Sequence, residues 1–211
     1  MTARIPVRAP IVGRFVRLDP MTPDDYPGLF AALAHPEVFA GGYGGGPAGL
    51  PNDLEGFIRF AEAYYPKETN HSFTVRLVDG EADGVIVGTS TLGDFDELNE
   101  HAHIGWTAYD PRVWGSAVNP ETKLLLLGLA FDSGFGRVKI QADERNERSR
   151  AAIAKIGATF EGLIRREKRR ADGSWRTTAL FSVIVEEWPD VRAGLEERLA
   201  RHDGPVTLRT R

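Results

Sequence analysis

Two stretches of the chain combine side chains and backbone in patterns that could do chemistry. The first is Arg112-Val113-Trp114-Gly115-Ser116-Ala117-Val118-Asn119-Pro120, between a strand-like run and a strongly apolar, helix-like run. Asn119 can cap the following helix with its side-chain oxygen, and Pro120 suits the first helical position. Free backbone N–H groups and the positive end of a helix dipole then meet at one point, as a bound phosphate requires. The loop is therefore predicted to bind an anion, although a capped loop without a ligand would have the same sequence.

The second stretch places histidines in a predicted strand over residues 101–109. His101 and His103 share one face of this strand, because side chains alternate with a period of two. An ordinary histidine pKa of about 6.5 makes His103 a candidate general base near neutrality, directly or through a water. Glu97 and Glu100 are alternative bases. A strand histidine is also often only a half-buried polar residue.

Composition limits the classes of protein and partner. The 211 residues are 42% hydrophobic, enough for one domain with a sizeable core. The net charge of −4 gives no global field for nucleic acid or an anionic membrane, so neither is expected as a partner. The chain has no cysteine, which excludes disulfides, thiolate metal sites and a cysteine nucleophile, and no metal site is predicted. The first residues lack the apolar core of a secretion signal, so a cytoplasmic protein is expected.

The elements that must position these residues follow from hydrophobic periodicity and turn signals. A glycine-rich loop at 41–47 is expected to lack regular structure and to act as a spacer or a mobile lid. Strand, helix and strand across residues 101–142 imply a parallel crossover. One domain over 1–211 is expected, with a C-terminal helix at about 186–202. Strands are predicted at 7–18, 72–78, 84–92, 101–109, 137–142, 159–167 and 175–185, and helices at 22–34, 52–65, 123–131, 146–156 and 190–201.

In this order of elements, Arg112-x-x-Gly115-x-Ala117 resembles the R/Q-x-x-G-x-G/A signature of the GNAT superfamily of acetyl-CoA-dependent N-acetyltransferases. Asn146-Glu147-Arg148-Ser149 with Ile153 and Gly157-Ala158 is similar to a stretch of the branch that contains the ribosomal-protein N-terminal (alanine/serine) acetyltransferases. The segment 17–25 is similar to the first strand and helix of that branch. The resemblance covers about residues 13–185.

The resemblance implies a GNAT-like α+β fold. Its central twisted sheet would have about seven strands, mostly antiparallel, with helices on both faces. The strands over residues 101–109 and 137–143 would be its parallel pair, and they would splay apart to hold the pantetheine of acetyl-CoA. Phe39, Tyr43 and the glycine loop would wall the acceptor pocket. The implied cofactor-binding residues are Trp106, Thr107, Ala108, Arg112, Trp114, Gly115, Ser116, Ala117, Asn119, Lys123 and Asn146.

The sequence departs from the family at two catalytic positions. Ile153 stands where many members have the tyrosine that protonates the departing thiolate, and Ser149 is the substitute proposed in the ribosomal-protein branch. His103 stands where a glutamate often precedes Ile-Gly-Trp. Catalytic roles are therefore predicted for His103 and Ser149.

The expected activity is transfer of acetyl from acetyl-CoA to a primary amine by direct attack in a ternary complex. The acceptor amine could be a protein N-terminus or a small molecule, and a homodimer is compatible with family habit. The alternative is a catalytically silent CoA-binding or regulatory domain. Another kind of nucleotide-binding protein is disfavoured, because neither a G-x-G-x-x-G motif nor a Walker lysine-serine motif occurs.

Overall fold

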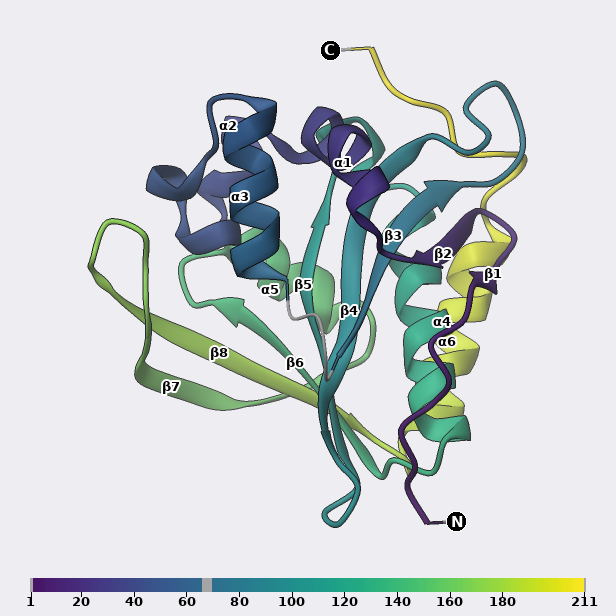
Figure 1. Cartoon of the computed structure of the whole chain (residues 1–211). Helices are drawn as coiled ribbons and strands as arrows, with labels where there is room; N and C mark the ends of the chain where they lie inside the picture. Colours follow the sequence, from purple (N-terminus) through teal and green to yellow (C-terminus); the bar gives the residue numbers. More distant parts are fainter. Residues whose placement is uncertain (1, 66–69, 211) are drawn as a thin grey trace.

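The computed structural model describes residues 2–65 and 70–210, and it shows one mixed eight-stranded sheet with helices on both faces (Figure 1). Neighbouring strands are antiparallel except for β5 and β6, which are parallel. The predicted α+β class and parallel pair are confirmed. The strands are β1 (Ile11–Val12), β2 (Val16–Pro20), β3 (His71–Leu77), β4 (Ile86–Asp96), β5 (His101–Tyr109), β6 (Arg137–Asp143), β7 (Thr159–Arg169) and β8 (Trp175–Ile184), in the spatial order β1-β2-β3-β4-β5-β6-β8-β7.

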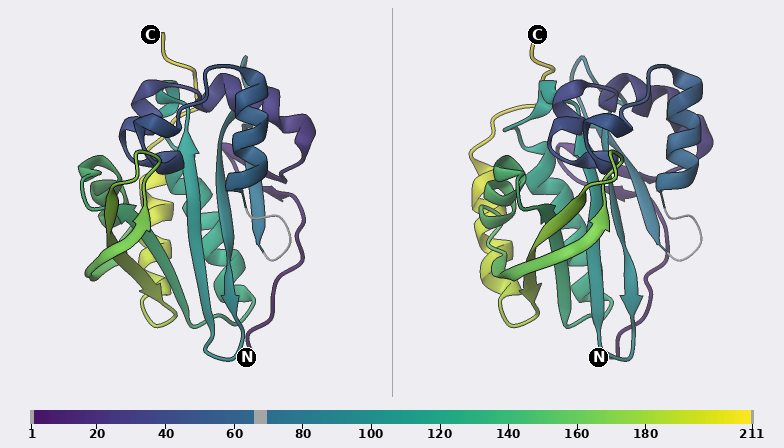
Figure 2. Two further views of the ribbon diagram at one scale, coloured as in Figure 1. Left: turned by 60° about the vertical axis from the view of Figure 1, so that its left-hand side comes forward. Right: turned by 90° about the vertical axis from the view of Figure 1, so that its left-hand side faces the viewer.

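Each face of the sheet has its own apolar core. Ile86 and Val87 are adjacent in β4 and therefore point to opposite faces, and each belongs to a different core. The helices α1 and α3 cover one face, and α4 and α6 cover the other (Figures 1 and 2). The helices are α1 (Tyr26–Leu33), α2 (Pro36–Ala40), α3 (Leu54–Tyr64), α4 (Val118–Asp132), α5 (Glu147–Ala154) and α6 (Trp188–Ala200).

The eighth strand arises because the predicted first strand is a hairpin of β1 and β2. Glu121 of α4 is 4% exposed, and its carboxylate accepts the backbone N–H groups of Arg14, Phe15 and Val16 at 2.8, 2.6 and 2.7 Å. A Cβ on Gly13 would lie 2.5 Å from the Glu121 carboxyl carbon. The buried Glu121 carboxylate thus stabilises the turn between β1 and β2. The pattern of residues 7–18 alone could not predict this turn, because Glu121 is distant in the sequence.

The glycine-rich loop also differs from its prediction. It forms two short 3₁₀ turns, η2 (Tyr43–Gly45) and η3 (Pro47–Gly49), after the small helix α2. Tyr43 is buried, and the Gly45 carbonyl accepts the N–H of Ala171 from the turn between β7 and β8 at 3.0 Å. The loop therefore packs against the β7–β8 hairpin, whose turn lies beside it in Figure 2.

The sheet opens between β5 and β6. Their parallel pairing runs from His101 with Arg137 to Ile104 with Ile140 and stops there. Beyond that point β5 carries one extra residue against β4, and Trp106 has a φ of +48°. The two strands diverge, so the main-chain groups that follow Ile104 and Ile140 have no strand partner across the gap among the described residues.

Candidate active site

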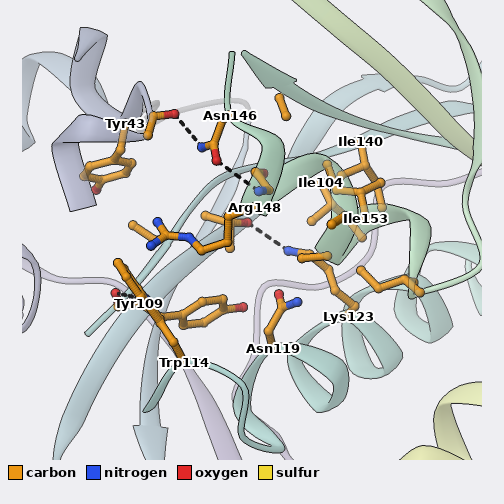
Figure 3. A pocket seen from close by; sticks show the side chains of 18 of the residues that line it. Tyr43, Ile104, Tyr109, Trp114, Asn119, Lys123, Ile140, Asn146, Arg148 and Ile153 are labelled. Atoms are coloured by element: carbon orange, nitrogen blue, oxygen red, sulfur yellow. Dashed lines mark hydrogen bonds between the residues drawn. The ribbon is translucent and has the colours of Figure 1, made fainter. Parts of the chain in front are cut away.

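A cleft of about 410 Å³ occupies the gap between β5 and β6 (Figure 3). Its walls come from the ends of these strands, the loop before α4, and the first turns of α4 and α5. Ten residues of the predicted site line it: Trp106, Thr107, Ala108, Trp114, Gly115, Ser116, Asn119, Lys123, Asn146 and Ser149.

The loop before α4 presents unused N–H groups to this cleft. The helix begins at Val118 with Ala117 at the cap position, so the prediction that Asn119 caps it was wrong. The Ser116 hydroxyl accepts the Val118 N–H at 3.3 Å, and Asn119 lines the cleft instead. Within the described chain, the amides of Gly115, Ala117 and Asn119 have no hydrogen-bond partner. Gly115 has a φ of +77°, and a Cβ there would meet no atom closer than 3.9 Å. The loop is open and polar, as an anion site requires.

The structure directs two predicted residues away from the cleft. The Arg112 guanidinium forms a forked ion pair with Asp110, at 2.7 Å between Nη2 and Oδ2 and 3.1 Å between Nε and Oδ1. Asp110 is fully buried, so this pair fixes the shape of the loop. Ala117 is buried behind the loop, and neither Arg112 nor Ala117 is a lining residue.

Asn146 joins two walls of the site. Its Oδ1 accepts the Ser149 N–H at 2.9 Å, which caps α5 as predicted. Its Nδ2 donates to the carbonyl of Gly41, the first residue of the glycine-rich loop (Figure 3). Ser149 lies in the first turn of α5 and faces the same cleft.

Lys123 is buried on the helix side of the cleft. It is 3% exposed, and its Nζ donates to the hydroxyl oxygens of Thr107 and Ser90 at 2.8 and 3.2 Å. Burial without a carboxylate partner lowers the pKa of Lys123 from 10.5 to about 7. Lys123, which the resemblance implies as a cofactor-binding residue, is therefore a desolvated amine in the interior that lines the cleft.

Arg148 and Trp114 face each other across the cleft (Figure 3). The Arg148 guanidinium carbon lies 3.3 Å from the centroid of the Trp114 ring, in cation–π contact. This contact joins the start of α5 to the loop before α4. The sequence motifs did not single out Arg148, because an exposed arginine in a first helical turn has no distinctive pattern.

His103 lines a second cavity of about 280 Å³, which shares Gly42, Tyr64, Gly105, Trp106, Gln141 and Arg176 with the cleft. The His103 Nδ1 lies 2.8 Å from a carboxylate oxygen of Asp94, and its buried Nε2 has no hydrogen-bond partner among the described residues. A Cβ on Gly105 would lie 2.6 Å from the His103 ring. The ring therefore folds over the β5 backbone at the point where the strands separate.

The pair of His103 and Asp94 has the electrostatics of an oriented base. A hydrogen bond from His103 lowers the pKa of Asp94 to about 2, so Asp94 is ionised. Burial lowers the pKa of His103 below 6.5, against the opposing effect of Asp94. The imidazole is neutral at pH 7. With Nδ1–H donated to Asp94, the lone pair is on Nε2.

The alternative bases lie elsewhere. Glu97 accepts the backbone N–H of Ile5 at 3.0 Å, and Glu100 follows it in the turn between β4 and β5. Neither lines the cleft or the second cavity. Asp94 lies beyond the strand predicted at 84–92. In the structure it belongs to the end of β4, and its proximity to His103 depends on strand register.

Residues 16–159 match the acetyltransferase (GNAT) domain family. The chain belongs to this family. It is similar to a GCN5-related N-acetyltransferase from Brucella melitensis, at 26% identity over 95% of this chain and 90% of the other, with a TM-score of 0.84. A T. thermophilus protein assigned as an acetyltransferase is 30% identical over 93% of this chain and 100% of its own, with a TM-score of 0.81.

The GNAT fold extends to the branch indicated by the motifs. RimJ of Mycobacterium smegmatis, solved in complex with CoA-disulfide, has a TM-score of 0.67 at 21% identity, over 90% of this chain and 93% of its own. A search of curated proteins found none that matches. GNAT enzymes use acetyl-CoA as the acetyl donor. In the described part of the chain, no helix is long and apolar enough to cross a membrane.

Proposed function

We propose that this GNAT protein acetylates a primary amine by direct attack, with acetyl-CoA in the cleft between β5 and β6 and His103 as general base. The observation that carries the proposal is the position of His103. Its ring is held by Asp94, its Nε2 is unpaired among the described residues, and it lines a cavity that adjoins the cleft through Gly105 and Trp106.

The cleft fits acetyl-CoA on three independent grounds. The diverging strands leave main-chain groups available to an extended amide chain such as pantetheine. Gly115 and Asn119 line the cleft at a helix start, and their amides have no hydrogen-bond partner among the described residues, which suits a pyrophosphate. Arg148, Lys155 and Arg198 add positive charge to the lining, whereas its one carboxylate among the described residues, Asp143, is paired with Arg170. Arg112 acts on this site by holding the loop.

Acetyl-CoA would supply an activated carbonyl for attack by the amine. The amine must be neutral when it attacks, and its proton passes to His103 Nε2 as the new C–N bond forms. Asp94 stabilises the imidazolium that results. The departing sulfur keeps the electron pair of the broken C–S bond, and Ser149 is our candidate for the group that gives it a proton. Main-chain N–H groups of β5 are candidates for stabilising the carbonyl oxygen.

A binding measurement and a turnover measurement test this function together. We expect isothermal titration to show one CoA site per chain, and a thiol-release assay over a panel of amines to show turnover above background. Absence of heat with millimolar CoA would contradict the cofactor site. CoA binding with no turnover for any amine would contradict the catalytic proposal and favour a silent CoA-binding domain.

Replacement of Gly115 with valine tests the proposed pyrophosphate position. Because Gly115 has a φ of +77° and faces open space, a branched side chain there strains the loop and occupies the ligand's place. We expect the Kd for CoA to rise at least about tenfold, or roughly 1.4 kcal/mol.

The matched control is Gly84→Val, which has a φ of +73°, open surroundings and a position in the turn between β3 and β4. It imposes similar backbone strain outside the cleft. Equal losses of CoA affinity in both variants would show that strain, not ligand contact, is responsible.

A further inference from the structure

The cavity beside His103 is basic, although the whole chain has a net charge of −4. Its lining includes Lys168, Arg169, Arg170 and Arg176, and no described lining residue is a carboxylate. Three of these belong to the charged run at 165–170, Arg-Arg-Glu-Lys-Arg-Arg. The β7–β8 hairpin turns this end of the run toward the glycine-rich loop, as Figure 2 shows.

Two of the four cations are already engaged. Arg170 forms a buried forked pair with Asp143, at 2.7 Å between Nη2 and Oδ2, and also donates to the Trp175 carbonyl. Arg169 lies 4.4 Å from the Trp175 ring centroid and donates to the Gly173 carbonyl. These side chains build the hairpin end and have little capacity left for a ligand.

Arg176 and Lys168 are not engaged in this way. Arg176 is half-buried, its Nε is fully buried without a hydrogen-bond partner, and it makes no ion pair with any carboxylate in the described part of the chain. Lys168 likewise has no ion pair there, and its Nζ lies 5.9 Å from the Trp106 ring centroid. A buried guanidinium nitrogen without a partner costs free energy, which a bound anion would recover.

Arg176 lies where its positive charge could contact an acceptor amine bound next to His103. It lines both the cofactor cleft and the second cavity, and Gly105 and Trp106 are common to both spaces. An acceptor that places its amine near His103 can therefore place another group against Arg176 and Lys168. The small volume of about 280 Å³ lies below the usual range for drug-sized ligands, so a compact acceptor is favoured.

We propose that the acceptor is a small primary amine that also carries an anionic group, a carboxylate or a phosphate, bound by Arg176 and Lys168. This inference rests on the proposed acetyltransferase function. A guanidinium binds either anion through paired N–H donors, so both sources share the same chemistry. Polyamines and other multiply charged cationic amines are disfavoured, because the cavity would place like charges together.

Matched pairs of amines test the charge requirement. L-amino acids are compared with the corresponding amino-acid amides, ethanolamine phosphate is compared with ethanolamine, and spermidine serves as the cationic amine. The amides have the more readily deprotonated amine, so chemistry alone favours them. We expect kcat/KM to be at least about tenfold higher for the anionic amine of each pair. A charge-assisted hydrogen bond to its carboxylate or phosphate would account for a difference of this size. The two pairs distinguish a carboxylate from a phosphate.

Arg176→Gln tests the residue. We expect the KM of the preferred anionic amine to rise at least about tenfold and the preference over its neutral partner to collapse, with the Kd for CoA changed less than about threefold. The matched control is Arg165→Gln, which removes an exposed charge from the same hairpin outside the cavity. It is expected to leave both constants unchanged.

The possible failures are distinguishable. Turnover of neutral or cationic amines at least as fast as anionic ones would overturn this inference and leave the acetyltransferase function standing. A loss of CoA affinity in Arg176→Gln with unchanged amine preference would assign Arg176 to the cofactor and would also overturn it. No turnover with any amine would contradict the proposed function itself.

Discussion

His103→Gln lowers kcat by about 10²–10⁴-fold with the best amine while leaving the Kd for CoA nearly unchanged, if the imidazole is the general base. Glutamine retains a polar side chain but cannot accept a proton near neutral pH. The fold should tolerate the change, because the Asp94 carboxylate is partly exposed and can be hydrated. Steady-state kinetics with saturating acetyl-CoA, together with titration of CoA, provide the measurement.

The pH dependence separates a base from a binding role. Burial lowers the pKa of His103, so its neutral form is the active one, and the acid limb of kcat falls with an inflection below 6.5. The protonation of the free amine is common to both proteins. The ratio of wild-type to variant rate should therefore fall as the pH drops below that inflection, by about tenfold for each pH unit. A constant ratio across this range would show that His103 is not the base.

Asp94→Asn provides the companion measurement. Loss of the carboxylate removes the interaction that favours the imidazolium, so the inflection moves to still lower pH and kcat falls about tenfold or more. A merely structural role for Asp94 would change stability without moving the inflection.

Lys123→Met stabilises the free protein by about 2–4 kcal/mol at pH 7, which raises its Tm by roughly 5–15 °C for a domain of this size. The lysine carries a desolvated amine with no carboxylate nearby, and methionine fills a similar volume without charge. Ser90 and Thr107 can still bond to each other, since their hydroxyl oxygens lie 2.7 Å apart. Calorimetry or denaturant unfolding at several pH values measures the difference.

The direction of the pH effect is fixed by the lowered pKa. Between about 7 in the folded protein and about 10.4 in the unfolded chain, the unfolded state binds more protons. The free energy of unfolding of the wild type therefore rises with pH across this window, and the advantage of Lys123→Met shrinks. Below pH 7 the advantage stays constant. Lys155→Met, an exposed residue of the same cleft, is the control and should change stability by less than about 0.5 kcal/mol. A less stable Lys123→Met protein would contradict this account.

Local signals predicted most of the sheet and the position of the cleft. The short runs that predicted β3, β4 and β5 and the alternating pattern that predicted β6 needed no knowledge of distant contacts. Asn146 identified the start of α5 through its capping chemistry. By contrast, the β1–β2 turn depends on Glu121, which lies more than a hundred positions along the chain.

The partners of the candidate catalytic residues were harder to predict from sequence, because they depend on the register between neighbouring strands. His103 was a candidate from its residue type, but Asp94 meets it only because β4 extends past the expected turn. The burial of Lys123 could not be predicted either, because it depends on the packing of α4 against Ser90 and Thr107. In the charged run at 165–170, the sequence does not indicate which side chains line the second cavity and which face solvent. Only the path of the hairpin separates Lys168 from Arg165.

The side chain of Asn146 binds the first turn of α5 and the carbonyl of Gly41, which both line the donor cleft, and Gly41 precedes Gly42, which lines both cavities. A Cβ on Gly41 would lie 2.6 Å from the Nδ2 of Asn146, so the Gly41 backbone and this side chain are closely packed. We expect a shift of α5 on donor binding to reach Gly41 through this side chain. Substitution of Asn146 is therefore expected to change the positions of both α5 and the glycine-rich loop.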